Sequence, residues 1–387
     1  MRTLLQNILS WLCVFVLIIG LSELTLRIVP SEAQYPPLYD YDYKDSLLGI
    51  EFFPSTVRTE RTACHTSVVT TNSFGWRDQE HAKERVPGLT RIAILGDSFM
   101  AGTQVNDDEV FARQLEKILG KDKVEVLNFG LSSIGTEQED ILYENVVSTF
   151  DPDIVLLAFY SNDVENSDPD MEGGPLHATR LTYRDDDGNL LSFRKRTPFD
   201  GTRHWLRMHS ALYRFANVLY RFARQETASP SGISGFPPYP REYHVFDAPA
   251  PPERERGWAR VDRAIQSLKR QISPPKQLIA FSVPELLETA PDIAALIRKQ
   301  YGQDPPKAFT PSYPFARFAK IAEHHGVPFI DLVPVFLAEQ SKRALVYPYF
   351  YFSCDGHWNA LGHTIAAEAV ARVVEKVIDS RTIHRSM

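Results

Sequence analysis

A serine, a histidine and an aspartate in this sequence have the types and order needed to cleave an ester. Ser98 closely follows the apolar run 92–95, and Asp355 and His357 stand two residues apart far downstream. A serine hydroxyl becomes a nucleophile when an imidazole takes its proton, and a carboxylate on the other ring nitrogen fixes the imidazole tautomer. The sequence therefore predicts nucleophilic catalysis if the fold brings Ser98 and His357 together.

Each of these residues also has an ordinary structural explanation. Ser98 can be the N-cap of the helix that follows a glycine turn, and an aspartate two residues before a histidine is a common pair. The functional interpretation depends on the elements that position the residues.

Short apolar runs alternate with segments of helical periodicity through most of the chain. Run 92–95 is β-branched and bounded by polar residues, as is typical of a strand buried on both faces. Alternating strands and helices pair in parallel through right-handed crossovers, so the strands end at one edge. We therefore expect an α/β fold with a parallel sheet. Further strands are predicted at 124–127, 153–159, 277–282 and 327–332, and helices at 111–119, 138–150, 255–272, 293–299, 314–325 and 360–377.

Polar residues follow two more strands at the same edge. Ser133 comes after strand 124–127, and Asn162 comes after strand 153–159. A tetrahedral oxyanion needs hydrogen-bond donors, which the Asn162 amide and the backbone N–H groups of Ser98 and Ser133 can supply from this edge. The alternative for Asn162 is an ordinary turn residue at a strand end.

In this order and spacing, the residues resemble the SGNH hydrolases of the GDSL esterase superfamily. The resemblance spans about residues 72–377 and implies a three-layer α/β/α, flavodoxin-like fold. It implies Ser98 as nucleophile, His357 as general base and acid, Asp355 as its orienting carboxylate and Asn162 as an oxyanion donor. The matching stretches are Gly96-Asp97-Ser98-Phe99, 128–135, Ser161-Asn162-Asp163 and Asp355-Gly356-His357.

Three positions depart from the family pattern. Ser133 replaces a glycine that donates through its backbone, and Tyr160 stands where a glycine is usual, which would shrink the acyl pocket. The acid lies two residues before the histidine rather than three. That spacing resembles a subgroup related to polysaccharide O-acetylation proteins.

The resemblance implies a serine ester hydrolase that removes short, acetyl-like acyl groups from a carbohydrate or cell-envelope component, without a cofactor or metal. Water and an alcohol attack an acyl-enzyme through the same machinery, so an O-acyltransferase acting on a polysaccharide is an alternative. A second alternative is a catalytically inactive glycan-binding or scaffold protein, which the intact set of Ser98, Asn162 and His357 disfavours. The net charge of -7 argues against a nucleic-acid partner. The oligomeric state stays open.

The amino-terminal segment is almost wholly apolar between residues 4 and 21. Roughly 18 to 20 such residues can cross a bilayer as a helix. We expect residues 1–29 to be a membrane anchor or signal-anchor, with a cleaved signal peptide as the alternative. Arg2 favours an inside amino terminus and an exported body, in the periplasm or at the cell exterior.

The remaining chain divides into three expected parts. Residues 30–88 are predicted to be a tether and a β lead-in, and residues 89–380 a hydrolase-like domain with a helical insertion at about 164–253. We interpret the insertion as covering or narrowing the site. It contains one predicted amphipathic helix, with apolar residues Trp205, Met208, Leu212, Phe215, Leu219 and Phe222.

The insertion also carries a basic cluster, for which we expect a solvated face, with lipid headgroups or an acidic polymer as alternatives. The cluster consists of Arg194, Lys195, Arg196, Arg203 and Arg207.

Two cysteines lie outside the anchor, Cys64 and Cys354. An oxidising compartment would permit them to pair, and a bond there would pin the loop that carries Asp355. Two unpaired thiols are the alternative. Arg77 and Trp76 are expected to pack at the surface, with a position at the border of the site as the alternative.

Overall fold

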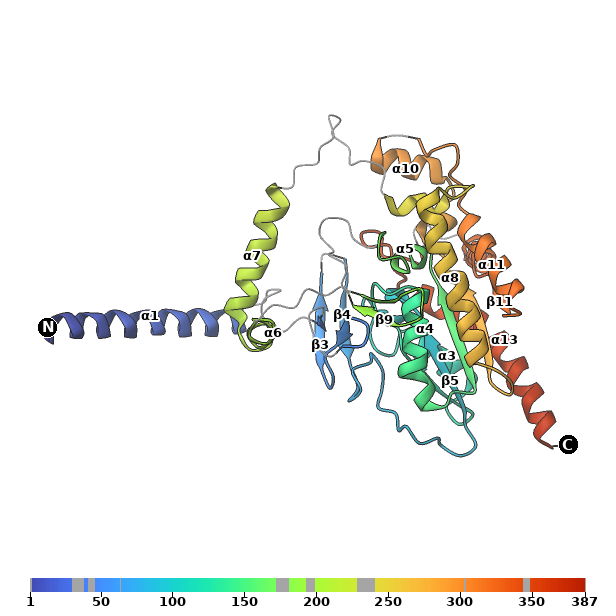
Figure 1. Ribbon diagram of the computed structural model, residues 1–387, viewed down its shortest axis with the longest axis horizontal. Coiled ribbons are helices and arrows are strands. Elements are labelled where there is room, and N and C mark those ends of the chain that lie inside the picture. Colours follow the sequence, from blue (N-terminus) through green and yellow to red (C-terminus); the bar gives the residue numbers. More distant parts are fainter. Residues whose placement is uncertain are drawn as a thin grey trace.

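The computed structural model of the chain describes residues 2–29, 38–40, 46–62, 64–171, 181–192, 199–227, 241–302, 304–343 and 349–386. Its centre is a five-stranded sheet in which every neighbouring pair is parallel (Figure 1). The predicted α/β fold with a parallel sheet is confirmed. The strands are β5 (Thr90–Leu95), β6 (Val124–Asn128), β7 (Ile154–Phe159), β10 (Gln277–Ser282) and β11 (Phe329–Ile330).

The order of the strands places a change in the direction of winding at one edge of the sheet. The spatial order is β11-β10-β7-β5-β6, so the chain goes from β5 to β6 on one side and continues through β7 on the other. In such doubly wound sheets, ligands bind where the direction of winding changes, outside the carboxyl ends of the strands. Here that point lies between β5 and β7, directly where Ser98 follows β5.

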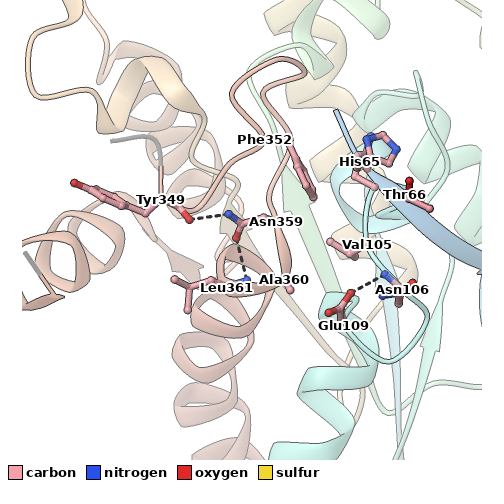
Figure 2. A pocket seen from close by; sticks show the side chains of 11 residues that line it. His65, Thr66, Val105, Asn106, Glu109, Tyr349, Phe352, Asn359, Ala360 and Leu361 are labelled. Carbon is pink, nitrogen blue, oxygen red and sulfur yellow. Dashed lines mark hydrogen bonds between the residues drawn. The ribbon is translucent and has the colours of Figure 1, made fainter. Parts of the chain in front are cut away.

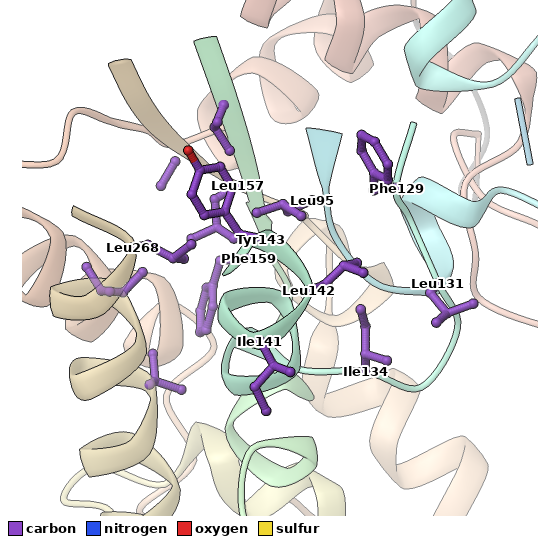
Figure 3. Close-up of a cluster of buried hydrophobic side chains, with 14 of the residues drawn as sticks. Leu95, Phe129, Leu131, Ile134, Ile141, Leu142, Tyr143, Leu157, Phe159 and Leu268 are labelled. Carbon is purple, nitrogen blue, oxygen red and sulfur yellow. The ribbon is translucent and has the colours of Figure 1, made fainter. Parts of the chain in front are cut away.

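Helices cover both faces of the sheet, giving three layers. One core packs α4 (Thr136–Asn145), α8 (Pro252–Gln271) and α11 (Tyr313–His324) against the strands. Figure 3 shows Ile141 and Leu142 of α4 and Leu268 of α8 close to Leu95 and Leu157 of the strands. The other core packs α3 (Phe111–Leu119), α12 (Val333–Arg343) and α13 (Ala360–Ser386).

The predicted helix at 138–150 consists of two elements, α4 and the 3-10 turn η1 (Val147–Phe150). The consecutive β-branched residues Val146 and Val147 lie at the break, where their restricted rotamers disfavour a continuous helix. The remaining short elements are α2 (Ser98–Ala101), α5 (Asp163–Asn166), η2 (Arg241–Phe246), α9 (Leu286–Thr289) and α10 (Ile293–Tyr301).

A small β region precedes the main sheet. Strand β1 (Tyr39–Asp40) pairs with β2 (Glu51–Phe52), and β3 (Val57–Arg61) forms an antiparallel hairpin with β4 (Thr66–Thr70). The hairpin is joined to the segment after α2, because Ser67 Oγ donates to the Thr103 carbonyl at 2.6 Å. Residues 30–37 and 41–45, at the start of the expected tether and β lead-in, lie outside the described residues.

The insertion contains a short hairpin, β8 (Thr182–Arg184) with β9 (Leu190–Ser192), and two helices, α6 (Asp200–His209) and α7 (Ala211–Thr227). The prediction of one amphipathic helix is wrong. The helix breaks at Ser210, whose backbone is extended and whose Oγ accepts the Tyr213 N–H at 3.1 Å, as an N-cap does. Apolar residues recur on both sides of the break, so periodicity alone does not reveal it.

The start of helix α7 contacts the last turns of α1 (Arg2–Ile28), and α7 lies apart from the central sheet, so it does not form the cover that the sequence suggested (Figure 1). Within α1, Gln6–Ile28 is long and apolar enough to cross a membrane. Of the predicted basic cluster, Arg194, Lys195 and Arg196 lie outside the described residues, as does the side chain of Phe222.

Candidate active site

Ser98 begins the single-turn helix α2 immediately after β5. Asp97 caps this turn, because its Oδ1 accepts the Phe99 N–H at 2.9 Å. A Cβ on Gly96 would lie 2.3 Å from the Met100 side chain, so only glycine permits this close approach. The strand and the tight turn together present the Ser98 side chain at the carboxyl edge of the sheet.

The structure brings Ser98, His357 and Asp355 into one hydrogen-bonded row. His357 Nε2 lies 2.7 Å from Ser98 Oγ, and His357 Nδ1 lies 2.7 Å from Asp355 Oδ1. An ionised carboxylate only accepts hydrogen bonds, so Nδ1 carries the proton and Nε2 is left to accept from the serine hydroxyl. Neither His357 nor Asp355 is fully buried, and their side chains are 25% and 23% exposed. An incoming ester can therefore reach the row from solvent.

The loop before α13 fixes the acid and the base relative to each other. Asp355 Oδ1 also accepts the His357 backbone N–H at 2.9 Å, and the Phe352 N–H donates to the His357 carbonyl at 2.9 Å. Gly356 between them has φ +83°, a left-handed conformation that favours glycine. Asn359 Oδ1 accepts the N–H groups of Leu361 and Gly362, so Asn359 is the N-cap of α13.

Asp355 is held in its ionised form. Burial alone would raise its pKa, but the hydrogen bonds from the His357 ring and backbone and the charges of His357 and His65 outweigh burial and lower the pKa. An ionised Asp355 can stabilise the imidazolium that forms when His357 takes a proton.

Sequence reasoning missed His65. The structure contains a disulfide between Cys64 and Cys354, which ties the β3–β4 hairpin to the loop of Asp355. The bond places His65 Nδ1 4.0 Å from Asp355 Oδ2, with the His65 side chain 7% exposed. The only available signal in the sequence was its position beside Cys64.

Ser133 is positioned by the chain that continues β6 past the end of β5. The N–H groups of Phe129 and Leu131 donate to the carbonyls of Ile94 and Gly96, so this chain runs beside the turn that leads to Ser98. Ser133 has φ +65°, the left-handed conformation that suits a glycine. The backbone therefore adopts a glycine-like shape at this position although its residue is serine.

Asn162 and Tyr160 follow β7 at the same edge. Asn162 stands at the start of α5, where its carbonyl accepts the N–H groups of Glu165 and Asn166. The Tyr160 ring lies 4.7 Å from the Phe99 ring, and its hydroxyl donates to Glu285 at 2.7 Å. Phe99 also contacts the His357 ring at 4.7 Å, so the bulk of Tyr160 lies in the immediate surroundings of the row.

Three carboxyl groups are buried beneath Ser98. Burial raises the pKa of Asp97 to about 6, against the lowering effects of the Phe99 N–H, the His357 charge and the Ser98 hydroxyl. Burial and the neighbouring carboxylates raise the pKa values of Glu139 and Asp163 well above the ordinary range. Neither carboxyl oxygen of Glu139 has a hydrogen-bond partner among the described residues. Burial therefore favours the neutral form of Glu139 and Asp163 over the ionised form.

Arg77 is buried, and the expectation that it packs at the surface is wrong. Its side chain is 2% exposed, and its guanidinium donates to the carbonyls of Ala101 at 2.9 Å, Val105 at 2.6 Å and Gly102. Burial lowers the pKa of Arg77, against the raising effect of Asp107. Arg77 thus stabilises the turn that ends α2, the helix that carries Ser98.

A pocket of about 550 Å³ borders the loop of Asp355. Figure 2 shows His65 of the hairpin, Val105 and Glu109 of the segment after α2, and Phe352 and Asn359 of the loop around it. Ser98 and His357 do not line this pocket. Asp355 does not line it either, so the pocket adjoins the loop of Asp355 without including the hydrogen-bonded row.

Comparison with known proteins finds only weak matches to solved structures. No family model and no curated protein matches the chain. Among solved structures, the acetyl xylan esterase AlAXEase matches with a TM-score of 0.40 and 14% identity over 73% of this chain and 99% of that chain. The acetylxylan esterase Axe2 from Geobacillus stearothermophilus matches with a TM-score of 0.36 and 15% identity, over 73% of this chain and 93% of that chain. The α/β hydrolase LAE5 from the metagenome of Lake Arreo matches with a TM-score of 0.35 and 13% identity, over 73% of this chain and 93% of that chain. Because these TM-scores lie below 0.5, the function has to be derived from the site itself.

Proposed function

We propose that this protein is a serine ester hydrolase of the SGNH type. The observation that carries the proposal is the row in which His357 Nε2 lies 2.7 Å from Ser98 Oγ and His357 Nδ1 lies 2.7 Å from Asp355. These are the distances at which an imidazole can take a hydroxyl proton while a carboxylate holds its other nitrogen. We expect Ser133 and Asn162, which follow two further strands of the sheet, to supply the other groups of the site.

The geometry supports a two-step reaction. Ser98 Oγ attacks the acyl carbonyl as His357 Nε2 takes its proton, and the negative charge develops on the carbonyl oxygen. The Asn162 amide and the backbone N–H groups of Ser98 and Ser133 would stabilise that oxyanion. His357 then gives the proton to the leaving alcohol, which leaves the acyl group on Ser98. Water repeats the sequence, with His357 as base, and releases the acid and free Ser98.

The surroundings of Ser98 favour a short acyl group. Tyr160 stands where the family has a glycine, its ring packs on Phe99, and its hydroxyl is held by Glu285. Rotating this ring away would break its hydrogen bond to Glu285, so the space beside the nucleophile stays small. Acetyl-like esters of a carbohydrate or envelope component are the proposed substrates.

We also propose that the protein is anchored by α1 with the catalytic domain exported. The apolar length of Gln6–Ile28 suffices to span a bilayer. A disulfide that joins Cys64 to Cys354 is the kind of bond that persists in an oxidising compartment rather than in the cytosol.

The test uses the full-length protein in detergent with p-nitrophenyl esters of acetate and octanoate. We expect acetate to be hydrolysed faster, and Ser98→Ala to abolish turnover. Ser148→Ala is the matched control, because Ser148 lies in η1 near the opposite edge of the sheet and should leave the rate unchanged. Equal rates for the wild type and Ser98→Ala would reject the proposal.

A further inference from the structure

Helices α6 and α7 expose large apolar side chains that the domain does not cover. Trp205 is 57% exposed on α6, and Phe215 and Leu219 are 37% and 53% exposed on α7. Phe215 and Leu219 are four residues apart, so they lie on one face of α7. An amphipathic helix of a soluble domain normally buries such a face in the core. None of the described residues buries this face, so it is open to an occupant from outside them.

Contacts with α1 fix where this face lies. The Glu23 carboxylate accepts the N–H groups of Ala211 at 2.8 Å and Leu212 at 2.9 Å, and the Ser210 hydroxyl at 2.9 Å. Arg27, four residues further along α1, donates to the His209 carbonyl at 2.6 Å. Free N–H groups at the start of a helix and free carbonyls at its end need such partners. The junction of α6 and α7 is thus tied to the last turns of α1.

That junction lies at the level where α1 would leave a bilayer. The apolar run 4–21 ends just before Glu23. At a rise of about 1.5 Å per residue, its 18 residues span about 27 Å, close to the roughly 30 Å thickness of the hydrocarbon core. Figure 1 shows α7 running across the end of α1 rather than alongside it. A helix in that position lies along the membrane surface.

The charges near the junction suit this location. Arg203 and Arg207 lie on α6, and the Trp205 ring stacks on His209 at 4.9 Å. Helices that lie in the membrane interface combine basic residues with exposed aromatic and aliphatic side chains, and tryptophan is enriched at headgroup level.

We propose that α6 and α7 form an interfacial helix pair in the headgroup layer of the bilayer that α1 spans. Phe215 and Leu219 contact lipid, and anionic headgroups lie near Arg203 and Arg207. The proposal rests on the membrane anchor of the proposed function. Because the His204 ring of α6 lies 5.7 Å from the Phe53 ring of the β region, the pair would also link the membrane surface to the catalytic domain.

The test places a nitrobenzoxadiazole probe on single cysteines of the full-length protein in nanodiscs of phosphatidylcholine and phosphatidylglycerol. Native Cys13, which is free and exposed on α1, reports the anchor. Leu219→Cys reports α7, and Val57→Cys, at a position 71% exposed on β3, is the matched control; both carry Cys13→Ser. Nitroxide lipids labelled in mid-chain or at headgroup level and aqueous iodide are the quenchers.

We expect mid-chain nitroxide to quench most of the fluorescence of the Cys13 probe. Headgroup-level nitroxide should quench most of the fluorescence of the residue-219 probe. The residue-57 probe should be quenched by iodide alone. If the residue-219 probe responds to iodide as strongly as the control, the proposal is wrong while a quenched Cys13 still supports the anchor. A residue-219 probe shielded from both lipid and iodide also overturns it, because protein then covers the face. If Cys13 is not quenched by lipid, the anchor and the interfacial pair fail together.

Discussion

Removal of the Cys64–Cys354 disulfide should weaken the fold. The bond closes a loop with a sequence separation of 290 residues. Loop-closure entropy for a loop of that length corresponds to about 5.7 kcal/mol at 25 °C, as an upper bound, and removal of native disulfides typically costs about 2 to 5 kcal/mol. We expect Cys64→Ser with Cys354→Ser to lower the free energy of unfolding by about 4 kcal/mol, measured by urea denaturation in detergent.

The double substitution Cys64→Ser with Cys354→Ser should also lower kcat by a larger factor than it raises KM. Cys354 directly precedes Asp355, and the bond holds this loop against the hairpin that carries His65. A carboxylate that shifts by about 1 Å no longer orients His357 well, and misplacements of that size cost up to about 10²-fold in rate. We therefore expect kcat for an acetyl ester to fall by about 10- to 100-fold.

Cys13→Ser is the control, because Cys13 is free and exposed on α1. Cys13→Ser should change neither the free energy of unfolding nor kcat. The reasoning would be refuted if the double variant unfolded at the same urea concentration as the wild type and kept its kcat.

Three further changes test other parts of the site. Burial and the charges of Arg77 and His357 lower the pKa of His363 to about 3, and its Nδ1 accepts the Phe111 N–H at 3.2 Å. Below pH 6.5, His363 therefore binds fewer protons in the folded state than in the unfolded state. When the pH falls from 6.5 to 4, the free energy of unfolding of the wild type should decrease by on the order of 3 kcal/mol more than that of His363→Gln. Urea denaturation measures this difference, and parallel pH profiles for the two proteins would contradict the prediction. Ser133→Gly should retain kcat, because glycine adopts φ +65° without strain. Ser133→Val places a β-branched residue at this φ and should lower kcat, and it should lower the free energy of unfolding by about 1 to 2 kcal/mol. Equal kcat values and equal unfolding free energies for the two variants would count against a strained backbone at this position. Asn162→Ala should lower kcat for the acetyl ester by about 10²- to 10³-fold with little change in KM, and the reverse pattern would remove Asn162 from the oxyanion site.

The sequence was sufficient to predict the sheet and the edge at which the polar residues gather. Ser98, Ser133 and Asn162 each follow a strand of that sheet, and parallel strands end at a common edge. The spacing of Asp355 and His357 was likewise visible, because both belong to one loop.

The features that the sequence did not predict depend on partners far away in the chain. Arg77 is buried because its guanidinium meets carbonyls near residue 102, and an arginine gives no local sign of such acceptors. The break at Ser210 is stabilised by Glu23 on α1, 187 residues away. His65 reaches Asp355 only because a disulfide joins two distant segments.

The central claim is that Ser98 carries the acyl group between the two halves of the reaction. The most direct test mixes the full-length protein with an activated acetyl ester, quenches the reaction with acid during turnover, and locates any acetyl group by peptide mass spectrometry. We expect an acetyl group on the peptide that contains Ser98, absent in Ser98→Ala. Acetyl release that proceeds with no acetyl on Ser98, or with acetyl on another residue, would contradict the mechanism.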